Sequence, residues 1–147
     1  MANRPSIHEA VVSRKVPRPV GPGPHAIRVE VPGESLFVSG MLPQDAMGKM
    51  VTAEIKKQAE LALGHVRNVV VDAKFSMDDL VRCTIYLTDI NDAEAVDQVY
   101  QKMFVGQMLP ARTVIQVAAL PKGAHIQVDA IAVKRGKSVE EALAEEE

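Results

Sequence analysis

Two segments of the chain carry hydrophobic residues at the period of an amphipathic helix. Between residues 52 and 73 these positions recur three or four residues apart, as one buried helix face requires. The residues expected on that face are Ile55, Ala59, Ala62, Val66, Val69 and Ala73. A second stripe with the same period consists of Ala93, Val96, Tyr100 and Met103. Thr52 is the expected cap of the first helix, and Asn91 with Glu94 has cap spacing for the second.

Other segments show the period of a β-strand. In residues 80–87 the side chains of Cys83, Ile85 and Leu87 alternate with those of Arg82, Thr84 and Tyr86. Four further apolar segments are predicted strands, at residues 26–31, 36–41, 112–117 and 126–133. A tight turn at residues 32–35 is expected to join the first two. The order is therefore β-β-α-β-α-β-β. Because each helix lies between strands and can serve as a crossover, the sheet is expected to be mixed.

The last strand is apolar on both of its faces. Ile126, Val128, Ala130 and Ala132 point one way, whereas Ile131 and Val133 point the other way. Two helices can cover only one face of the sheet, and the chain offers no further element for the second face. The pattern thus predicts an α+β fold with two helices on one face, and a second copy of the chain as the other cover.

Length, composition and charge limit the number of domains and the kinds of partner. With 147 residues, 47% of them hydrophobic, the chain suits one compact domain. We expect the domain at residues 16–135, a flexible polar arm at residues 1–15 and an acidic C-terminal tail at residues 136–147. The net charge of −2, with basic and acidic residues interleaved, gives no electrostatic reason to expect a nucleic-acid partner. Apolar runs of signal-peptide or membrane-span length are absent, so no membrane partner and a cytoplasmic location are expected.

One arginine is the foremost candidate for ligand chemistry. Arg112 lies between Pro110 and Thr113 at the start of a strand-prone segment. Its planar, permanently charged fork suits bidentate capture of a carboxylate or phosphate, although most strand arginines lie along a solvated face. The single cysteine, Cys83, is interpreted as a buried hydrophobe rather than a nucleophile. The spacing of the four histidines does not fit a metal site, and no glycine-rich phosphate loop is present, so neither a metal nor a cofactor is expected.

Four short motifs occur in an order typical of one known family. They are Leu36-Phe37-Val38-Ser39-Gly40, Pro110-Ala111-Arg112-Thr113, the segment at residues 117–123, and Asp129-Ala130-Ile131-Ala132. Through these motifs, residues 16–134 closely resemble the reactive-intermediate deaminase (Rid) family. The family is also called YjgF-like, and its members are often labelled L-PSP endoribonucleases. The resemblance implies a homotrimer of chorismate-mutase-like α+β subunits, with ligand clefts between neighbouring subunits.

The resemblance also implies an activity and a site. The family's characteristic reaction is hydrolysis of a reactive enamine or imine to a keto acid and ammonia, without a metal or organic cofactor. The motif arginine binds the substrate carboxylate in the family, and this role falls on Arg112. Ser39 and Gly40 would line the same cleft. Such a substrate is already electrophilic, so the protein needs only to hold it, favour the protonated imine and place a water.

Four positions depart from the deaminating pattern. His25 replaces a tyrosine that follows Gly-Pro, and Asp97 stands where a ligand-proximal asparagine is expected. Val114 replaces a small Cys or Ser, and Gln127 stands at the position of the water-positioning glutamate. An amide can orient a water but cannot take its proton, so Gln127 is not a base. His25, with an ordinary pKa of about 6.5, is the candidate for that role.

Three functional hypotheses remain open at this point. The first is an imine or enamine deaminase, with a looser similarity of residues 17–25 to 2-aminomuconate deaminases. The second is a trimeric protein that binds small carboxylates through Arg112 without turnover. The third is an endoribonuclease, which the family label suggests but which the acidic net charge and the lack of an aromatic-basic surface disfavour.

Overall fold

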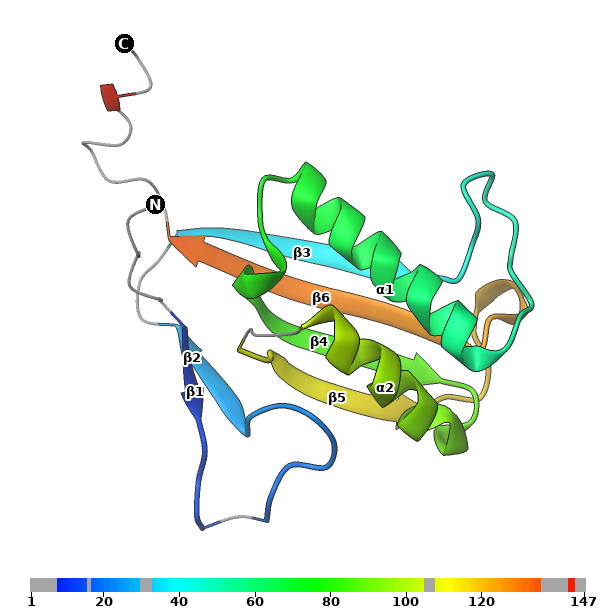
Figure 1. The fold of residues 1–147 in the computed structure, drawn as a ribbon, viewed down its shortest axis with the longest axis horizontal. Helices are drawn as coiled ribbons and strands as arrows, with labels where there is room; N and C mark the ends of the chain where they lie inside the picture. The colour runs from blue at the N-terminus through cyan, green and yellow to red at the C-terminus, as the bar shows by residue number, and fades with distance from the viewer. Residues whose placement is uncertain (1–7, 16, 30–32, 105–107, 136–142, 145–147) are drawn as a thin grey trace.

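A mixed four-stranded sheet forms the centre of the protein. The computed structural model describes residues 8–15, 17–29, 33–104, 108–135 and 143–144. Across the sheet the strands lie in the order β3 (Gly33–Met41), β6 (Ile126–Arg135), β4 (Leu80–Leu87) and β5 (Ala111–Gln116) (Figure 1). β6 pairs antiparallel with both β3 and β4, whereas β4 and β5 are parallel. The predicted α+β class and mixed sheet are confirmed.

Both helices lie on the same face of this sheet, as predicted. α1 (Ile55–Asp72) and α2 (Ala93–Met103) contact each other and cover β3, β6, β4 and β5 from one side (Figure 1). Their side chains meet the inward side chains of the strands in one hydrophobic core. The buried helix residues are Gln58, Ala59, Ala62, Leu63, Val66, Val70, Val96, Val99 and Tyr100. Burial of this apolar surface is the main stabilising contribution to the fold.

The helix starts differ from the expected caps. α1 begins at Ile55 directly after Glu54, and no side chain caps it, so Thr52 is not the cap. A short 3₁₀ turn, Ile90–Asp92, precedes α2, and the Asp89 carboxylate accepts the N–H of Asn91 at 3.0 Å. The prediction that Asn91 caps the second helix is therefore wrong. The reason is local: an aspartate two residues upstream captures this N–H first and starts the turn early.

The N-terminal region forms a separate hairpin. β1 (His8–Val11) pairs antiparallel with β2 (Ala26–Val29), and His8 Nε2 lies 2.6 Å from the carbonyl oxygen of Val133 in β6. Within the arm expected at residues 1–15, the structure thus places a strand at His8–Val11. The turn expected at residues 32–35 is also wrong where the structure describes it, because residues 33–35 belong to β3. β1 and β2 have only four residues each, which is too few to show a strand period in the sequence. Their pairing with each other therefore decides that they form strands. Most of the expected acidic tail lies outside the described residues.

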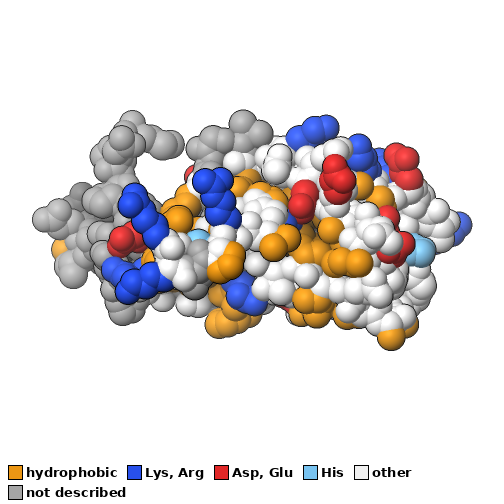
Figure 2. All heavy atoms as spheres, turned by 90° about the horizontal axis from the view of Figure 1, so that it is seen from below, with side chains coloured by type: hydrophobic (Ala, Val, Ile, Leu, Met, Phe, Trp, Pro, Cys, Tyr) orange, Lys and Arg blue, Asp and Glu red, His pale blue; other side chains and the backbone are white. Residues whose placement is uncertain are grey.

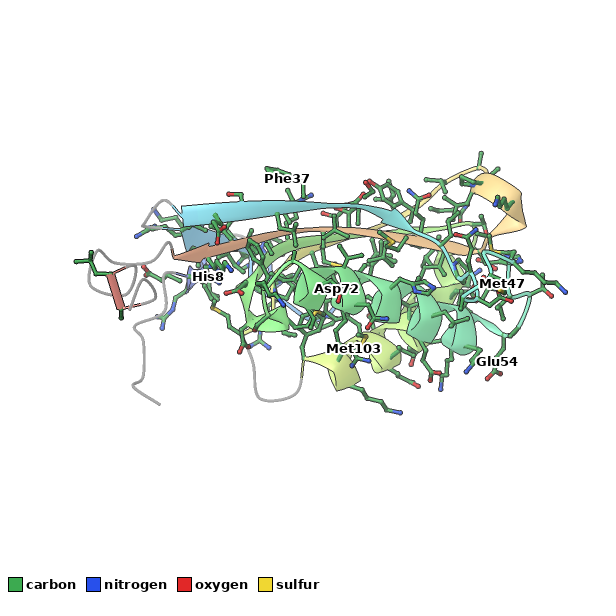
Figure 3. The ribbon with its side chains drawn as sticks, turned by 90° about the horizontal axis from the view of Figure 1, so that it is seen from above. His8, Phe37, Met47, Glu54, Asp72 and Met103 are labelled. Carbon is green, nitrogen blue, oxygen red and sulfur yellow. The ribbon has the colours of Figure 1, made fainter. Side chains whose placement is uncertain are left out.

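The second face of the sheet carries apolar side chains that no element of the described chain covers. On β6, Ile126, Val128, Ala130 and Ala132 are buried beneath the helices, as predicted. Phe37 projects from the opposite face and is 73% exposed (Figure 3), and Ile131 lies beside it in register. We call this surface the open face. Among the described helices, none is both long and apolar enough to cross a membrane.

Candidate functional site

Arg112 lies on the helix-covered face at the edge of the sheet. It follows the first residue of β5 and is in register with the buried Cys83 of β4. Its side chain is only 5% exposed. Nη1 donates a hydrogen bond to Oδ1 of Asp97 on α2, and Cζ lies 5.0 Å from the centre of the Tyr100 ring. Arg112 therefore does not lie along a solvated strand face, and its charge is held by an ion pair and an aromatic ring.

A glycine turn closes over this arginine. Gly21 has a φ of +82°, and a Cβ added there would overlap Nη2 of Arg112 and lie 3.3 Å from Oδ2 of Asp97. At Gly23, with a φ of +134°, a Cβ would lie 3.0 Å from the carbonyl oxygen of Pro110. Only glycine combines this backbone conformation with such a close approach. We call Arg112, Asp97, Tyr100 and Gly21 the arginine cluster.

The arginine cluster has unused hydrogen-bonding groups. Among the residues that the structure describes, the buried hydroxyl of Tyr100 has no hydrogen-bond partner. Burial raises the pKa of Tyr100, so at neutral pH the hydroxyl keeps its proton and can donate it. A buried polar group without a partner costs about 1–3 kcal/mol. The cluster is therefore suited to a further polar atom from a ligand or a water.

Cys83 lies next to the arginine cluster but has no nucleophilic character. It is a free, buried cysteine. Burial raises the pKa of its thiol to about 12, which outweighs the opposing effect of Arg112. The side chain is therefore a neutral thiol at physiological pH and packs as a small hydrophobe, in agreement with the sequence analysis.

Gly40 and Gln127 lie together at a different place, and Ser39 directly precedes Gly40 in β3. β3 has an irregularity between Val38 and Met41, where Ser39 and Gly40 lie. A Cβ added to Gly40 would overlap the Gln127 side-chain amide, so the backbone of β3 lies directly against Gln127. Gln127 is in register with Tyr86, whose pKa is raised mainly by its hydrogen bond to the Asp129 carboxylate. This second group of polar residues belongs to the open face.

One chain therefore does not bring Arg112 and Gln127 to the same ligand. Arg112 is level with Cys83 and Gln127 with Tyr86, three residues further along β4. An odd separation places the two side chains on opposite faces, and three residues span about 10 Å of strand. Val114 lies on the helix side with Arg112, but it packs against the hydrophobic core.

His25 lies in the N-terminal region and has partners at both ring nitrogens. Nδ1 accepts the backbone N–H of Ser13 at 3.0 Å, and Nε2 lies 2.7 Å from the carbonyl oxygen of Pro17. Because a carbonyl can only accept, these partners assign the neutral tautomer with its proton on Nε2. Within the described residues, none of the hydrogen bonds of His25 reaches Arg112 or Gln127.

The surface around His25 is basic. His25 borders a hollow of about 610 Å³ whose lining includes Arg14 and Arg18. Figure 2 shows lysine and arginine side chains gathered at this end of the molecule, and Arg14, Lys15 and Arg18 are exposed. No group of three or more histidine, cysteine or acidic residues that could hold a metal occurs among the described residues.

The sequence analysis missed two members of the arginine cluster. Tyr100 was identified only as part of the buried stripe of α2, although its ring also supports the guanidinium of Arg112. Gly21 was not considered for the site at all. The available signal was its position among closely spaced prolines and glycines at residues 17–24, a composition that indicates a strained, specific turn.

We expect Gly21→Ala to lower the free energy of unfolding by about 2–4 kcal/mol, since it adds both backbone strain and a clash with Arg112. Gly48→Ala is the matched control, because Gly48 has a φ of +83° but open space around its Cβ position. The control variant should lose only the strain, about 1–2 kcal/mol. Urea denaturation measures both losses. Equal losses in the two variants would show that the Gly21 turn does not press on Arg112.

Comparison with known proteins gives a consistent relationship over nearly the whole chain. A family model described as "Endoribonuclease L-PSP" matches residues 14–134. Protein DfrA of Myxococcus xanthus is 38% identical over 126 residues, covering 85% of this chain and 95% of the relative. The 2-iminobutanoate/2-iminopropanoate deaminase of Capra hircus is 34% identical over 129 residues, covering 87% of this chain and 91% of the relative.

A solved structure supports the same relationship. The crystal structure of Escherichia coli TdcF with bound serine is similar to this chain with a TM-score of 0.66 at 31% identity, covering 86% of this chain and 98% of that one. The order of motifs, the mixed sheet with two helices on one face and these matches agree. The chain therefore belongs to the L-PSP endoribonuclease family, the group of Rid or YjgF-like proteins.

Proposed function

We propose that this protein is a cofactor-independent hydrolytic deaminase that converts reactive enamines or imines to a keto acid and ammonia. The observation that carries the proposal is the arginine cluster. Arg112 has a buried, charged fork whose Nη2 has no hydrogen-bond partner among the described residues, next to the equally unpartnered hydroxyl of Tyr100. These are the donors that a small carboxylate requires. Relatives named as deaminases of 2-imino acids and of reactive intermediates support a deaminase function of the Rid type.

The proposed reaction site is shared between copies of the chain. Arg112 and Gln127 point from opposite faces of one sheet, so one ligand reaches both only if they come from different subunits. The open face supplies the surface for such contacts, with Phe37 73% and Ile115 41% exposed. A homotrimer with clefts between neighbouring subunits, as the family resemblance implies, satisfies both requirements.

In the proposed reaction, water adds to the carbon of the C=N bond and the resulting carbinolamine loses ammonia to leave the C=O group. Arg112 holds the substrate carboxylate and Gln127 orients the water, while Ser39 and Gly40 line the cleft. His25 is the candidate group that takes the proton from the water, and the proton then passes to the nitrogen that leaves as ammonia. For this role the Nδ1 of His25 must first release the N–H of Ser13, so the reactive form differs at this hydrogen bond from the structure described above.

A second candidate function is the binding of small carboxylates without turnover. It is favoured by one observation: the only lone pair of His25 is already engaged by Ser13, and Gln127 cannot act as a base. The serine in the TdcF structure is a carboxylate-bearing ligand in a relative of the same fold. The net charge of −2 argues against an endoribonuclease, because binding of a nucleic-acid backbone favours a basic protein.

The assembly is tested first. Light scattering at micromolar concentration should give three times the chain mass of 15.9 kDa. Phe37→Asp should reduce this mass, since it adds a charge to the open face. Val71→Asp, at a residue of α1 that is 55% exposed, is the control and should leave the assembly intact. A monomeric wild-type protein would contradict the shared cleft.

The ligand contact is tested by calorimetry with (S)-2-aminobutanoate, which carries the carboxylate that Arg112 is proposed to hold. Arg112→Ala should weaken binding by at least about 10-fold, as expected for loss of a charge-assisted hydrogen bond. Arg112→Lys should recover little affinity because lysine lacks the planar fork. Arg67→Ala removes an exposed arginine of α1 and serves as the control. If Arg112→Ala bound as tightly as the wild type, Arg112 would not be the carboxylate site.

Turnover is tested with 2-iminobutanoate generated in the assay by an amino-acid oxidase. The wild type should release ammonia faster than the uncatalysed reaction, with a rate that depends on pH near neutrality. His25→Phe should lower the rate by about 10²–10⁴-fold, the usual effect of losing a general acid or base. Gln127→Glu should preserve or raise the rate. Full activity in His25→Phe would exclude His25 as the base, and an inactive wild type would favour the binding function.

A further inference from the structure

We propose that Asp97 makes the arginine cluster selective for zwitterionic ligands, in which a carboxylate binds Arg112 and a cationic nitrogen binds Asp97. This inference rests on the proposed function for the site, and it narrows the ligand class. The ligands are 2-imino or 2-amino acids that carry a protonated nitrogen next to the carbon bearing the carboxylate. Simple carboxylates without that nitrogen are disfavoured.

The charges of the cluster give the first reason. Arg112 and Asp97 neutralise each other, and raised pKa values keep the neighbouring Tyr100 and Cys83 uncharged. A simple carboxylate that binds Arg112 has to compete with Asp97 and leaves one negative charge uncompensated in a largely buried place. A zwitterion brings its own positive charge, so each charged group keeps an opposite partner.

The positions of the free atoms give the second reason. Only Nη1 of Arg112 and Oδ1 of Asp97 are engaged in their ion pair. Nη2 and Oδ2 have no hydrogen-bond partner among the described residues, yet both border the point where Gly21 lacks a side chain. An unused cationic donor and an unused anionic acceptor thus converge on one small space. A ligand that carries a carboxylate and a cationic nitrogen on the same carbon matches this arrangement in charge.

The space is now filled by the backbone of Gly21, so a ligand has to displace the turn at residues 17–25. None of these nine residues is buried. A segment with so little buried surface opens at a low free-energy cost compared with unfolding of the core. The turn therefore excludes water from the empty cluster without blocking the entry of a ligand.

Asp97 has a further consequence for an imine ligand. A nearby carboxylate favours the protonated form of a basic nitrogen. The protonated imine is the form whose carbon is attacked by water. Asp97 accepts a hydrogen bond from the nitrogen without taking its proton, so it stabilises the reactive form and is distinct from the group that activates water. An asparagine offers the same shape without the charge.

The test compares two ligands that differ only in the nitrogen. Calorimetry measures binding of (S)-2-aminobutanoate and (S)-2-hydroxybutanoate to the wild type, Asp97→Asn and Glu60→Gln. The wild type should prefer the amino acid by at least about 10-fold. Asp97→Asn should abolish or reverse this preference by binding the hydroxy acid more tightly. Glu60→Gln removes one acidic charge from the exposed side of α1 and should keep the wild-type preference.

Two results would overturn the inference: equal affinity of the wild type for the two ligands, or an unchanged preference in Asp97→Asn. The first needs no variant, so the inference stays testable even if Asp97→Asn fails to fold. The outcome is separable from that of the proposed function. A protein that prefers the amino acid but does not hydrolyse 2-iminobutanoate refutes only the deaminase activity. A protein that hydrolyses it without the preference refutes only the role of Asp97.

Discussion

The ion pair between Arg112 and Asp97 is the interaction on which the candidate site depends. A guanidinium that is almost fully buried is costly unless an opposite charge and further polar contacts compensate it. Here the compensation comes from the helix α2, which supplies Asp97 and the Tyr100 ring, and from the Gly21 backbone, which lies far from Arg112 in the sequence. Each of these contacts fixes the arginine in one place. The same contacts also determine which of its donors remain available.

The alternation of side chains along a strand divides the candidate residues into two groups. Arg112 and Asp97 lie on the helix side of the sheet, while Gln127 and Gly40 belong to the open face. This division follows from the two-residue period of a strand and does not depend on any detail of side-chain conformation. In our proposal, a ligand that contacts both Arg112 and Gln127 therefore needs more than one copy of the chain at each site. The exposed Phe37 and Ile115 on the open face fit the same requirement.

Two positions of the proposed site differ in charge from the pattern that the family resemblance implies. A glutamine in place of a glutamate keeps the size of Gln127 and its contact with Gly40 but removes a base. An aspartate in place of an asparagine adds a charge that Arg112 neutralises. The two changes act in opposite directions on charge. In our proposal Gln127 supplies no carboxylate to the water, whereas the carboxylate of Asp97 acts on the ligand nitrogen.

The sequence by itself determined the two helices, the strands β4, β5 and β6, and the one-sided cover of the sheet. These segments are long enough to show a clear helix or strand period, and the period indicates which side chains are buried. It also identified Arg112, because a lone arginine in an apolar strand is conspicuous. Only the tertiary structure decided the pairing of β1 with β2, the closure of Gly21 over Arg112 and the separation of Arg112 from Gln127. These features arise from contacts between residues distant in the chain, and a local pattern carries no information about which distant backbone will approach.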